Sequence, residues 1–178
     1  MRFFIDTEFS DLSEQAQLIS LGAVAETGET FYREVDPLPS PLSDFVQAEV
    51  VPHLEGGDTS SSLKDLEARF IEWLSRWPTA TLVMDSDWDI FILRKTFTNN
   101  ISREPGPLRF RPHGREVLTV ELQLDTTYEG DGLVTYFDTL YKMEREPGFR
   151  KHHALDDAQA MRAAILAAEA VARAKGTV

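Results

Sequence analysis

Residues 2–9 read RFFIDTEF, and this stretch decides the fold. Its apolar residues predict a short buried strand over residues 2–6, with Asp6 and Glu8 at the strand's end. Side chains alternate along a strand, so these two carboxylates are expected on one face. Carboxylates side by side near a buried strand repel each other and lose hydration. A hard divalent cation relieves that repulsion, and Mg²⁺ prefers a few carboxylate oxygens plus water. The alternative is a solvent-facing pair, which the flanking phenylalanines disfavour.

The segments after this strand predict an antiparallel meander. Residues 17–25 (QLISLGAVA) and 29–35 (ETFYREV) are strand-like, and residues 26–29 carry a hairpin turn signal. Residues 80–85 (ATLVMD) predict a fourth strand. Apolar spacing and composition predict helices over residues 63–77, 88–98 and 155–175. The remaining expectations are a loop at 36–43, a short helix from Ser43 or Asp44 to Val51, loops at 56–62 and 99–114, and one strand and one helix within 115–140.

This order of elements predicts an α/β fold. We expect a mixed five-stranded sheet, in which the antiparallel three-strand meander is joined by parallel strands and helices cover both faces. The chain of 178 residues suits one domain spanning residues 1–178.

Two further segments offer carboxylates. DSDWDIFIL places three aspartates after the fourth strand, where Asp87 is predicted to cap a helix and Asp89 to point over the end of the sheet. HHALDDAQAMRAA places Asp157 on the inner face of the last helix and His152 on the loop before it. From spacing alone, His153 competes with His152 and Asp156 competes with Asp157.

Charge and composition limit the function classes. A net charge of −12 argues against a general nucleic-acid coat protein. Basic residues nevertheless gather between Arg94 and Arg115 and between Lys142 and Lys151, which favours local contact with a short strand, although solvated loops are the alternative. The chain has no cysteine, and it shows neither a signal peptide nor a membrane-spanning apolar run, so we expect a cytoplasmic protein with no membrane contact.

Taken together, the motifs resemble those of the DEDDh exonucleases of the ribonuclease H-like fold. The resemblance is carried by FIDTEF, by Asp89 after an apolar strand, and by the run from His152 to Ala158, HHALDDA. It selects His152 and Asp157 over their neighbours. RFFIDTEF, LISLGAVAETGETFY and FVQAEVVPHL are similar to the small ribonuclease-T-like exoribonucleases of the polyadenylate-specific RNase AS group. This closer match is good through about residue 98 and weakens over residues 99–150.

The resemblance implies a 3′→5′ exoribonuclease that releases 5′-mononucleotides from single-stranded RNA 3′ ends. Two Mg²⁺ ions, with Mn²⁺ as a substitute, would be held by Asp6, Glu8, Asp89 and Asp157, and the catalytic set would add His152 as the general base. It also implies a homodimer. The alternatives are a single-stranded DNA exonuclease of the same class, a non-catalytic nucleic-acid-binding module, and a phosphoesterase acting on mononucleotides.

Five residues are candidates for holding the substrate. Phe9 is expected to stack on a base or ribose, and Leu18 and Ile19 to wedge against the terminal base as apolar residues do in similar exonucleases. A place in the core is the alternative for all three. Arg150 and Lys151, just before His152, are the candidates for phosphate contacts.

Overall fold

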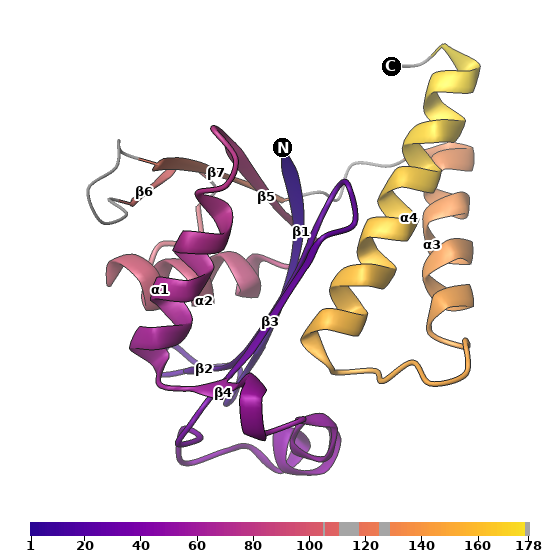
Figure 1. The fold of residues 1–178 in the computed structure, drawn as a ribbon. Coiled ribbons are helices and arrows are strands. Elements are labelled where there is room, and N and C mark those ends of the chain that lie inside the picture. Colours follow the sequence, from indigo (N-terminus) through magenta and orange to yellow (C-terminus); the bar gives the residue numbers. More distant parts are fainter. Residues whose placement is uncertain (105, 111–117, 125–128, 177–178) are drawn as a thin grey trace.

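A computed structural model describes the chain except for residues 105, 111–117, 125–128 and 177–178. One seven-stranded sheet, in the order β4-β3-β2-β1-β5-β7-β6, separates two layers of helices (Figure 1). The strands are β1 (Arg2–Phe9), β2 (Leu18–Ala25), β3 (Thr30–Val35), β4 (Ser60–Ser61), β5 (Ala80–Met84), β6 (Leu108–Phe110) and β7 (Leu118–Leu124). The helices are α1 (Leu63–Leu74), α2 (Asp87–Thr98), α3 (Gly130–Met143) and α4 (Ala154–Lys175).

The strand pairing confirms the predicted mixed sheet. β1, β2 and β3 form the antiparallel meander, and β5 and β7 extend it in parallel from β1. Helices α1 and α2 cover one face of this sheet and α3 and α4 the other (Figure 1). The arrangement is that of a ribonuclease H-like fold.

The strand count was wrong, because the described residues form seven strands of the sheet rather than five. β4 lies in the expected loop at 56–62 and pairs in parallel with β3, and β6 lies in the expected irregular segment 99–114 and pairs with β7. Both strands are two or three residues long. A strand this short has too few positions to show alternation, and it is defined by its partner's hydrogen bonds rather than by its own sequence.

Several element ends also differ from the predictions. Ser86, not Asp87, is the N-cap of α2, and its hydroxyl accepts the N–H of Trp88. The first long helix ends at Leu74 rather than at residue 77. The short helix expected up to Val51 is a π-helical turn, Val46–Val50, followed by a 3₁₀ turn, Val51–His53.

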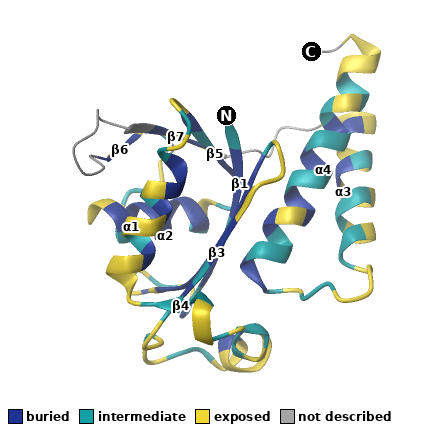
Figure 2. Ribbon diagram, in the orientation of Figure 1, coloured by how far each residue is buried: buried dark blue, intermediate teal, exposed yellow. Residues whose placement is uncertain are grey.

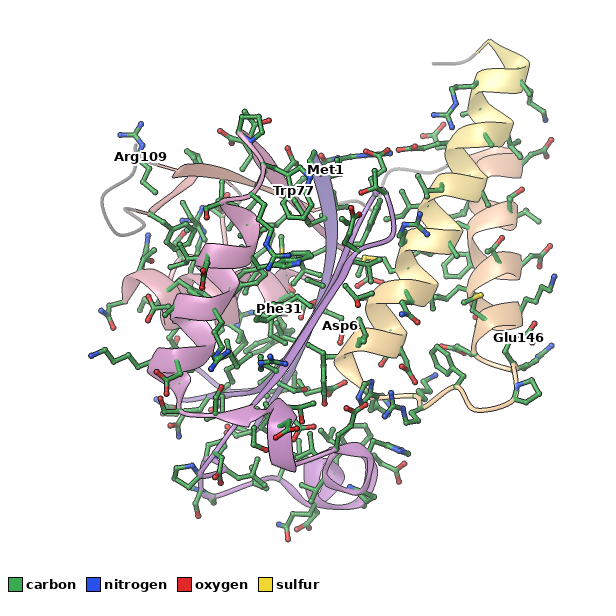
Figure 3. All side chains as sticks on the ribbon, in the orientation of Figure 1. Met1, Asp6, Phe31, Trp77, Arg109 and Glu146 are labelled. Carbon is green, nitrogen blue, oxygen red and sulfur yellow. The ribbon has the colours of Figure 1, made fainter. Side chains whose placement is uncertain are left out.

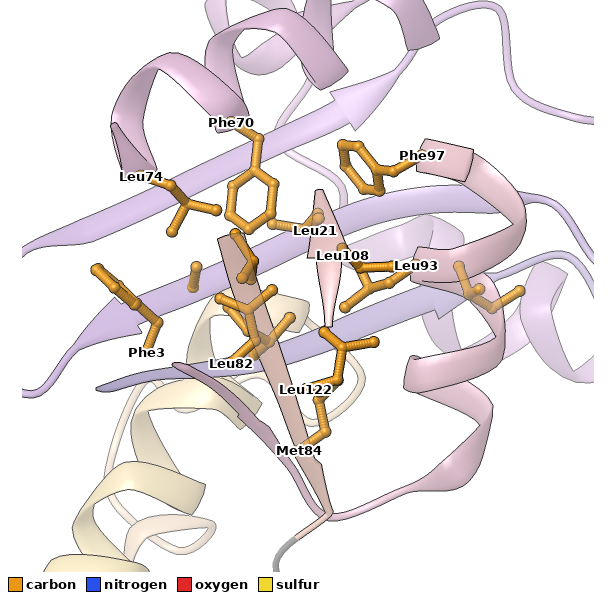
Figure 4. Packing of buried hydrophobic residues seen from close by; sticks show 14 of the residues in the cluster. Phe3, Leu21, Phe70, Leu74, Leu82, Met84, Leu93, Phe97, Leu108 and Leu122 are labelled. Carbon is orange, nitrogen blue, oxygen red and sulfur yellow. The ribbon is translucent and has the colours of Figure 1, made fainter. Parts of the chain in front are cut away.

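The two faces of β1 bury different residues. Phe3 and Ile5 pack in the cluster that α1 and α2 cover, whereas Phe4 packs with Met161 and Ile165 of α4. Figure 4 shows the first cluster closely, and Figure 2 shows how thoroughly the central strands are buried. Since alternate residues share a face, Asp6 and Glu8 follow Phe4 toward the α4 side.

The start of α4 lies directly on β2 at Gly22. A Cβ atom on Gly22 would lie 2.2 Å from the carbonyl carbon and oxygen of Ala154 and 2.3 Å from the nitrogen of Leu155. Gly22 is also paired with Asp6 across the β1–β2 ladder. The missing side chain therefore lets the first turn of α4, which carries Asp157, approach the acidic end of β1.

Candidate active site

The site begins where β1 and β5 separate. The two strands are paired only over Arg2–Phe4 of β1. Beyond Phe4, the side chain of Asp89 from α2 bonds to β1 in place of β5. The Thr7 backbone N–H donates to Asp89 Oδ1 at 3.0 Å, and the Thr7 hydroxyl donates to the same oxygen at 2.5 Å. Asp89 is thereby fixed beside β1, although α2 lies on the opposite face of the sheet from α4.

A pocket of about 500 Å³ opens at this point. Six acidic residues are among those that line it. Four of them are the predicted metal ligands, which come from β1, α2 and α4: Asp6, Glu8, Asp89 and Asp157. His152, from the loop before α4, lines it as well. Figure 3 shows Asp6 on the side of the sheet that faces α4. All five residues predicted to be catalytic therefore meet at one cavity.

Three of these residues form a compact group of possible metal ligands. One atom each from Glu8, His152 and Asp157 lie within 4.8 Å of one another. Asp6 and Asp89 stand outside this group but line the same pocket. Carboxylate oxygens suit Mg²⁺ or Mn²⁺, and an imidazole beside them also suits proton transfer.

The acidic residues are unfavourably placed without a cation. Burial, followed by repulsion from Asp89 and Glu8, raises the pKa of Asp6 well above its usual value. Burial and repulsion from Asp157 raise the pKa of Glu8 to about 8. Burial is also the main cause that raises the pKa of Asp89 and of Asp157 to about 7.

One carboxylate oxygen of Asp6 shows whether the site fits a metal. Asp6 Oδ2 is buried and has no hydrogen-bond partner among the described residues. No lysine or arginine is among the described residues that line the pocket. A buried acceptor among carboxylates, with no cationic side chain beside it, fits a bound divalent cation.

Comparison with known families identifies the enzyme class. Residues 1–168 match the profile of the 3′-5′ exoribonuclease Rv2179c-like domain. The chain belongs to this family. It is a 3′→5′ exonuclease that acts on nucleic acid, which confirms the class expected from the motifs. No curated protein sequence matches the chain. None of the helices in the described part of the chain combines the length and the hydropathy of a membrane span.

His152 has an unusual backbone in this exoribonuclease. Its φ of 63° lies in the left-handed region, which residues other than glycine rarely adopt. Its N–H donates to Asp157 Oδ2 at 2.8 Å, and its ring meets the ring of Phe45 edge-on, with centroids 5.1 Å apart. Burial and the charge of Lys151 lower the pKa of His152. A neutral imidazole therefore predominates at neutral pH, as a general base requires.

The predicted substrate-binding residues lie in different surroundings. Phe9 lines the pocket and stacks on Trp88 with ring centroids 5.9 Å apart. Leu18 and Ile19 are buried in the core and are not among the pocket's lining residues. Arg150 is bonded to Asp156 and Glu55, and Lys151 is exposed with its ammonium 3.3 Å from Glu144. Neither basic residue is among those that line the pocket.

Sequence reasoning missed the apolar rim of the pocket. Leu12 is 71% exposed and Phe45 is 55% exposed, and both line the cavity with the carboxylates. Leu12 had a weak signal, because it is the single apolar residue in DLSEQ. Phe45 had none, since a phenylalanine before VQAEV reads as part of a helix face. Asp85, which also lines the pocket, was recognised as one of three aspartates but not selected.

Proposed function

We propose that the chain is a Mg²⁺-dependent 3′→5′ exoribonuclease that removes 5′-mononucleotides from the 3′ ends of single-stranded RNA. The observation that carries this proposal is the meeting of Asp6, Glu8, Asp89 and Asp157 at one pocket that has no cationic side chain among its described lining residues. These four carboxylates would hold two Mg²⁺ ions, with Mn²⁺ as a substitute. When bound, such ions supply charge neutralisation for the phosphate and lower the pKa of a water molecule.

His152 is proposed as the general base. A neutral imidazole nitrogen at the pocket accepts the proton of the attacking water, while Asp157 holds the His152 backbone through the N–H that it accepts. Thr7 holds Asp89 in the same way from β1. The protein thus fixes its proton acceptor and its ligands before the substrate arrives, which reduces the reorganisation needed for catalysis.

The apolar rim is proposed to hold the terminal nucleoside. Phe45 and Leu12 expose large apolar surfaces beside the carboxylates, and nucleobases stack well on such surfaces. Phe9 offers a further ring to the same pocket. Ile19 packs against Val46 and Val50, which line the cavity, so its proposed contribution is to support that wall. Contact of Leu18 and Lys151 with substrate stays a prediction, whereas the bonds of the Arg150 guanidinium to Asp156 and Glu55 favour a role within the protein.

Three alternatives from the sequence are less well supported. A single-stranded DNA exonuclease would use the same residues, but the family is described by exoribonuclease activity. A non-catalytic binding module does not need four carboxylates and a histidine around one pocket. A phosphoesterase of the same metal chemistry would act faster on mononucleotides than on oligomers.

Digestion of matched oligomers tests the proposal. With Mg²⁺, 3′-labelled RNA is expected to release its labelled end as single nucleotides, and DNA of the same sequence is expected to do so more slowly. In EDTA, neither substrate should be digested. His152→Ala should keep metal binding, measured by calorimetry, and lose turnover by roughly 10²- to 10⁴-fold, which is the usual contribution of a general base. Nucleotide release in EDTA, or a near-normal kcat for His152→Ala, would contradict the proposed chemistry.

The assembly and location of the enzyme are further proposals. We propose a cytoplasmic homodimer built from one domain per chain. Support for the dimer comes from α3, which exposes Leu133, Val134, Phe137 and Tyr141. Sedimentation at several concentrations tests it, and a monomer throughout would contradict it.

A further inference from the structure

The loop that carries His152 is held by a group of charged residues that we call the Arg150 cluster: Glu55, Arg150, His153 and Asp156. None of the four is among the residues that line the pocket. Two of them flank His152 in sequence, at the second position before it and the first after it. The cluster is therefore placed to act on the pocket through His152 rather than by contact with substrate.

Arg150 contributes four hydrogen bonds to the cluster. Its backbone N–H and its Nε both donate to Asp156 Oδ2, at 3.0 and 2.9 Å, and its Nη2 donates to Asp156 Oδ1 at 3.0 Å. Its Nη1 donates to Glu55 Oε1 at 2.8 Å. A two-pronged contact of this kind fixes the orientation of a guanidinium as well as its position. Arg150 thus ties the loop to the first turn of α4 and to the segment around Glu55.

His153 holds the other side of His152. Its side chain is buried, its ring lies on that of Tyr32 with centroids 4.4 Å apart, and its Nδ1 accepts the Asp156 N–H at 3.4 Å. Its Nε2 lies 3.4 Å from Glu55 Oε1, the oxygen that Arg150 also contacts. Glu55 therefore contacts the neighbours of His152 on both sides.

Glu55 is itself anchored to the sheet. The backbone N–H groups of Glu55 and Gly56 donate to the two oxygens of Glu34 at 2.6 and 2.9 Å. Glu34 lies in β3, is buried, and also accepts the hydroxyl of Tyr32 at 2.8 Å. The cluster therefore connects the loop to a rigid strand rather than to a second loop.

A left-handed backbone at His152 needs such support. Backbone strain of this kind costs about 1–3 kcal/mol and persists only where the surroundings impose it. His152 itself donates one N–H bond to Asp157 and makes one edge-on ring contact with Phe45. The remaining constraint comes from the residues before and after it.

We propose that the Arg150 cluster is a positioning device for the general base, in which Arg150 and His153 hold the left-handed turn that directs His152 toward Glu8 and Asp157. This inference rests on the proposed role of His152. It assigns Arg150 a role within the protein, in place of the phosphate contact expected from its charge.

A double-mutant cycle between Arg150 and His152 tests the inference. Arg150→Met removes the guanidinium and keeps a similar length of apolar chain. In the wild-type background it should lower kcat by roughly 10- to 100-fold, since small displacements of a catalytic group have effects of this size. KM should stay within about twofold, because the cluster does not contact the pocket. In the His152→Ala background the same change should have almost no effect on the residual kcat.

Two outcomes separate the possible failures. The positioning role is overturned if Arg150→Met lowers kcat by the same factor in both backgrounds, or if it raises KM and leaves kcat unchanged. The proposed function stands in either case. A near-normal kcat for His152→Ala instead overturns the base assignment itself.

The matched control is Arg173→Met, which removes an exposed arginine that contacts Glu169 near the other end of α4. This variant should retain the wild-type kcat. If its kcat falls as far as that of Arg150→Met, the effect is general damage to the protein and the inference is overturned.

A second readout does not depend on turnover. The His152 ring resonance, assigned by its absence in His152→Ala, should broaden or split in Arg150→Met as the side chain samples several orientations. Arg150→Lys, which keeps the charge but not the two-pronged contact, should give the same change in a variant closer to wild-type stability. An unchanged resonance in both folded variants overturns the inference.

Discussion

Asp6 is an unfavourably placed side chain at the pocket when no cation is bound. Its Oδ2 is a buried acceptor without a hydrogen-bond partner among the described residues, and an unmet polar group of this kind costs about 1–3 kcal/mol. The neighbouring carboxylates add repulsion. A residue this poorly suited to the folded protein alone is explained by what it binds.

The exposed rim leads to a prediction at the same scale. Phe45→Ala should raise KM for RNA oligomers by roughly 5- to 100-fold, because stacking on one base contributes about 1–3 kcal/mol. Its effect on kcat should be smaller, except for loss of the edge-on contact with His152. Steady-state kinetics on one oligomer would measure both constants. Leu63→Ala, at an exposed apolar residue of α1 outside this pocket, is the control. An unchanged KM for Phe45→Ala would show that this ring does not bind the substrate.

Single residues differ in how far the sequence predicts them. The spacing of Asp6 and Glu8 was sufficient to place both on one face, because alternation in a strand is local geometry. Arg150 was assigned only by its charge and its position beside His152. Its contact with Glu55 joins residues far apart in sequence, so no local pattern reveals that the guanidinium is already bonded.

Among the elements, α4 is held at its first turn by several contacts. It begins with His153 as its N-cap, carries Asp157 in its first turn, and touches β2 at Gly22. A helix this long is predictable from its alanine-rich sequence. Its approach to the sheet is not, because that depends on the absence of a side chain on another strand.

The contact at Gly22 gives a prediction for the helix. Gly22→Ala places a methyl group 2.2 Å from backbone atoms of Ala154, so either α4 or β2 must shift. We expect loss of at least about 1–3 kcal/mol of unfolding free energy, as in other overpacked sites, together with a large fall in kcat as Asp157 moves from Glu8. Chemical denaturation and kinetics would measure the two effects. Gly28→Ala, in the β2–β3 turn, has room for a Cβ but a positive φ, so it measures the backbone strain of replacing a glycine without the clash, and it should leave kcat unchanged. A fully active, stable Gly22→Ala protein would contradict the close packing.

Short strands mark the limit of sequence reasoning about elements. The long buried strands and the helices with clear apolar faces were predicted with small errors at their ends. β4 and β6 were not, because their pairing partners lie outside the segment itself. The irregular segment between α2 and β7 contains one of them, and residues 111–117 there lie outside the described part of the chain.

The whole molecule is expected to respond to pH through its acidic pocket. For a carboxyl whose pKa is raised on folding, the folded state holds the proton more tightly than the unfolded state. Its contribution to stability is present at low pH and is lost as pH rises through the folded pKa. The stabilising contribution of Glu8 is lost as the pH rises from about 4.5 to about 8. The contributions of Asp89 and Asp157 are lost by about pH 7.

In EDTA, therefore, the unfolding temperature should fall between pH 5 and pH 8, since the three carboxyl groups together outweigh His152 and His153, whose lowered pKa values act in the opposite direction. Added Mg²⁺ should restore it at pH 8 more than at pH 5, because ionised carboxylates bind the cation. Differential scanning calorimetry at the two pH values, with and without Mg²⁺, would measure this. Glu8→Gln removes one of the titrating groups, and the fall with pH should be smaller in that variant. If the unfolding temperature rises from pH 5 to pH 8 in EDTA, the ionised carboxylates of the pocket do not destabilise the metal-free protein, and the prediction is wrong.

The packing of α4 on Gly22 also bears on how active members of this family are recognised from sequence alone. A chain can carry all five proposed catalytic residues and still be unable to bring them together if a larger residue occupies the position paired with Asp6. Motif searches that score only acidic residues and histidine would count such a chain as an enzyme. A glycine in the second strand, opposite the first aspartate, is a structural condition that such searches should add.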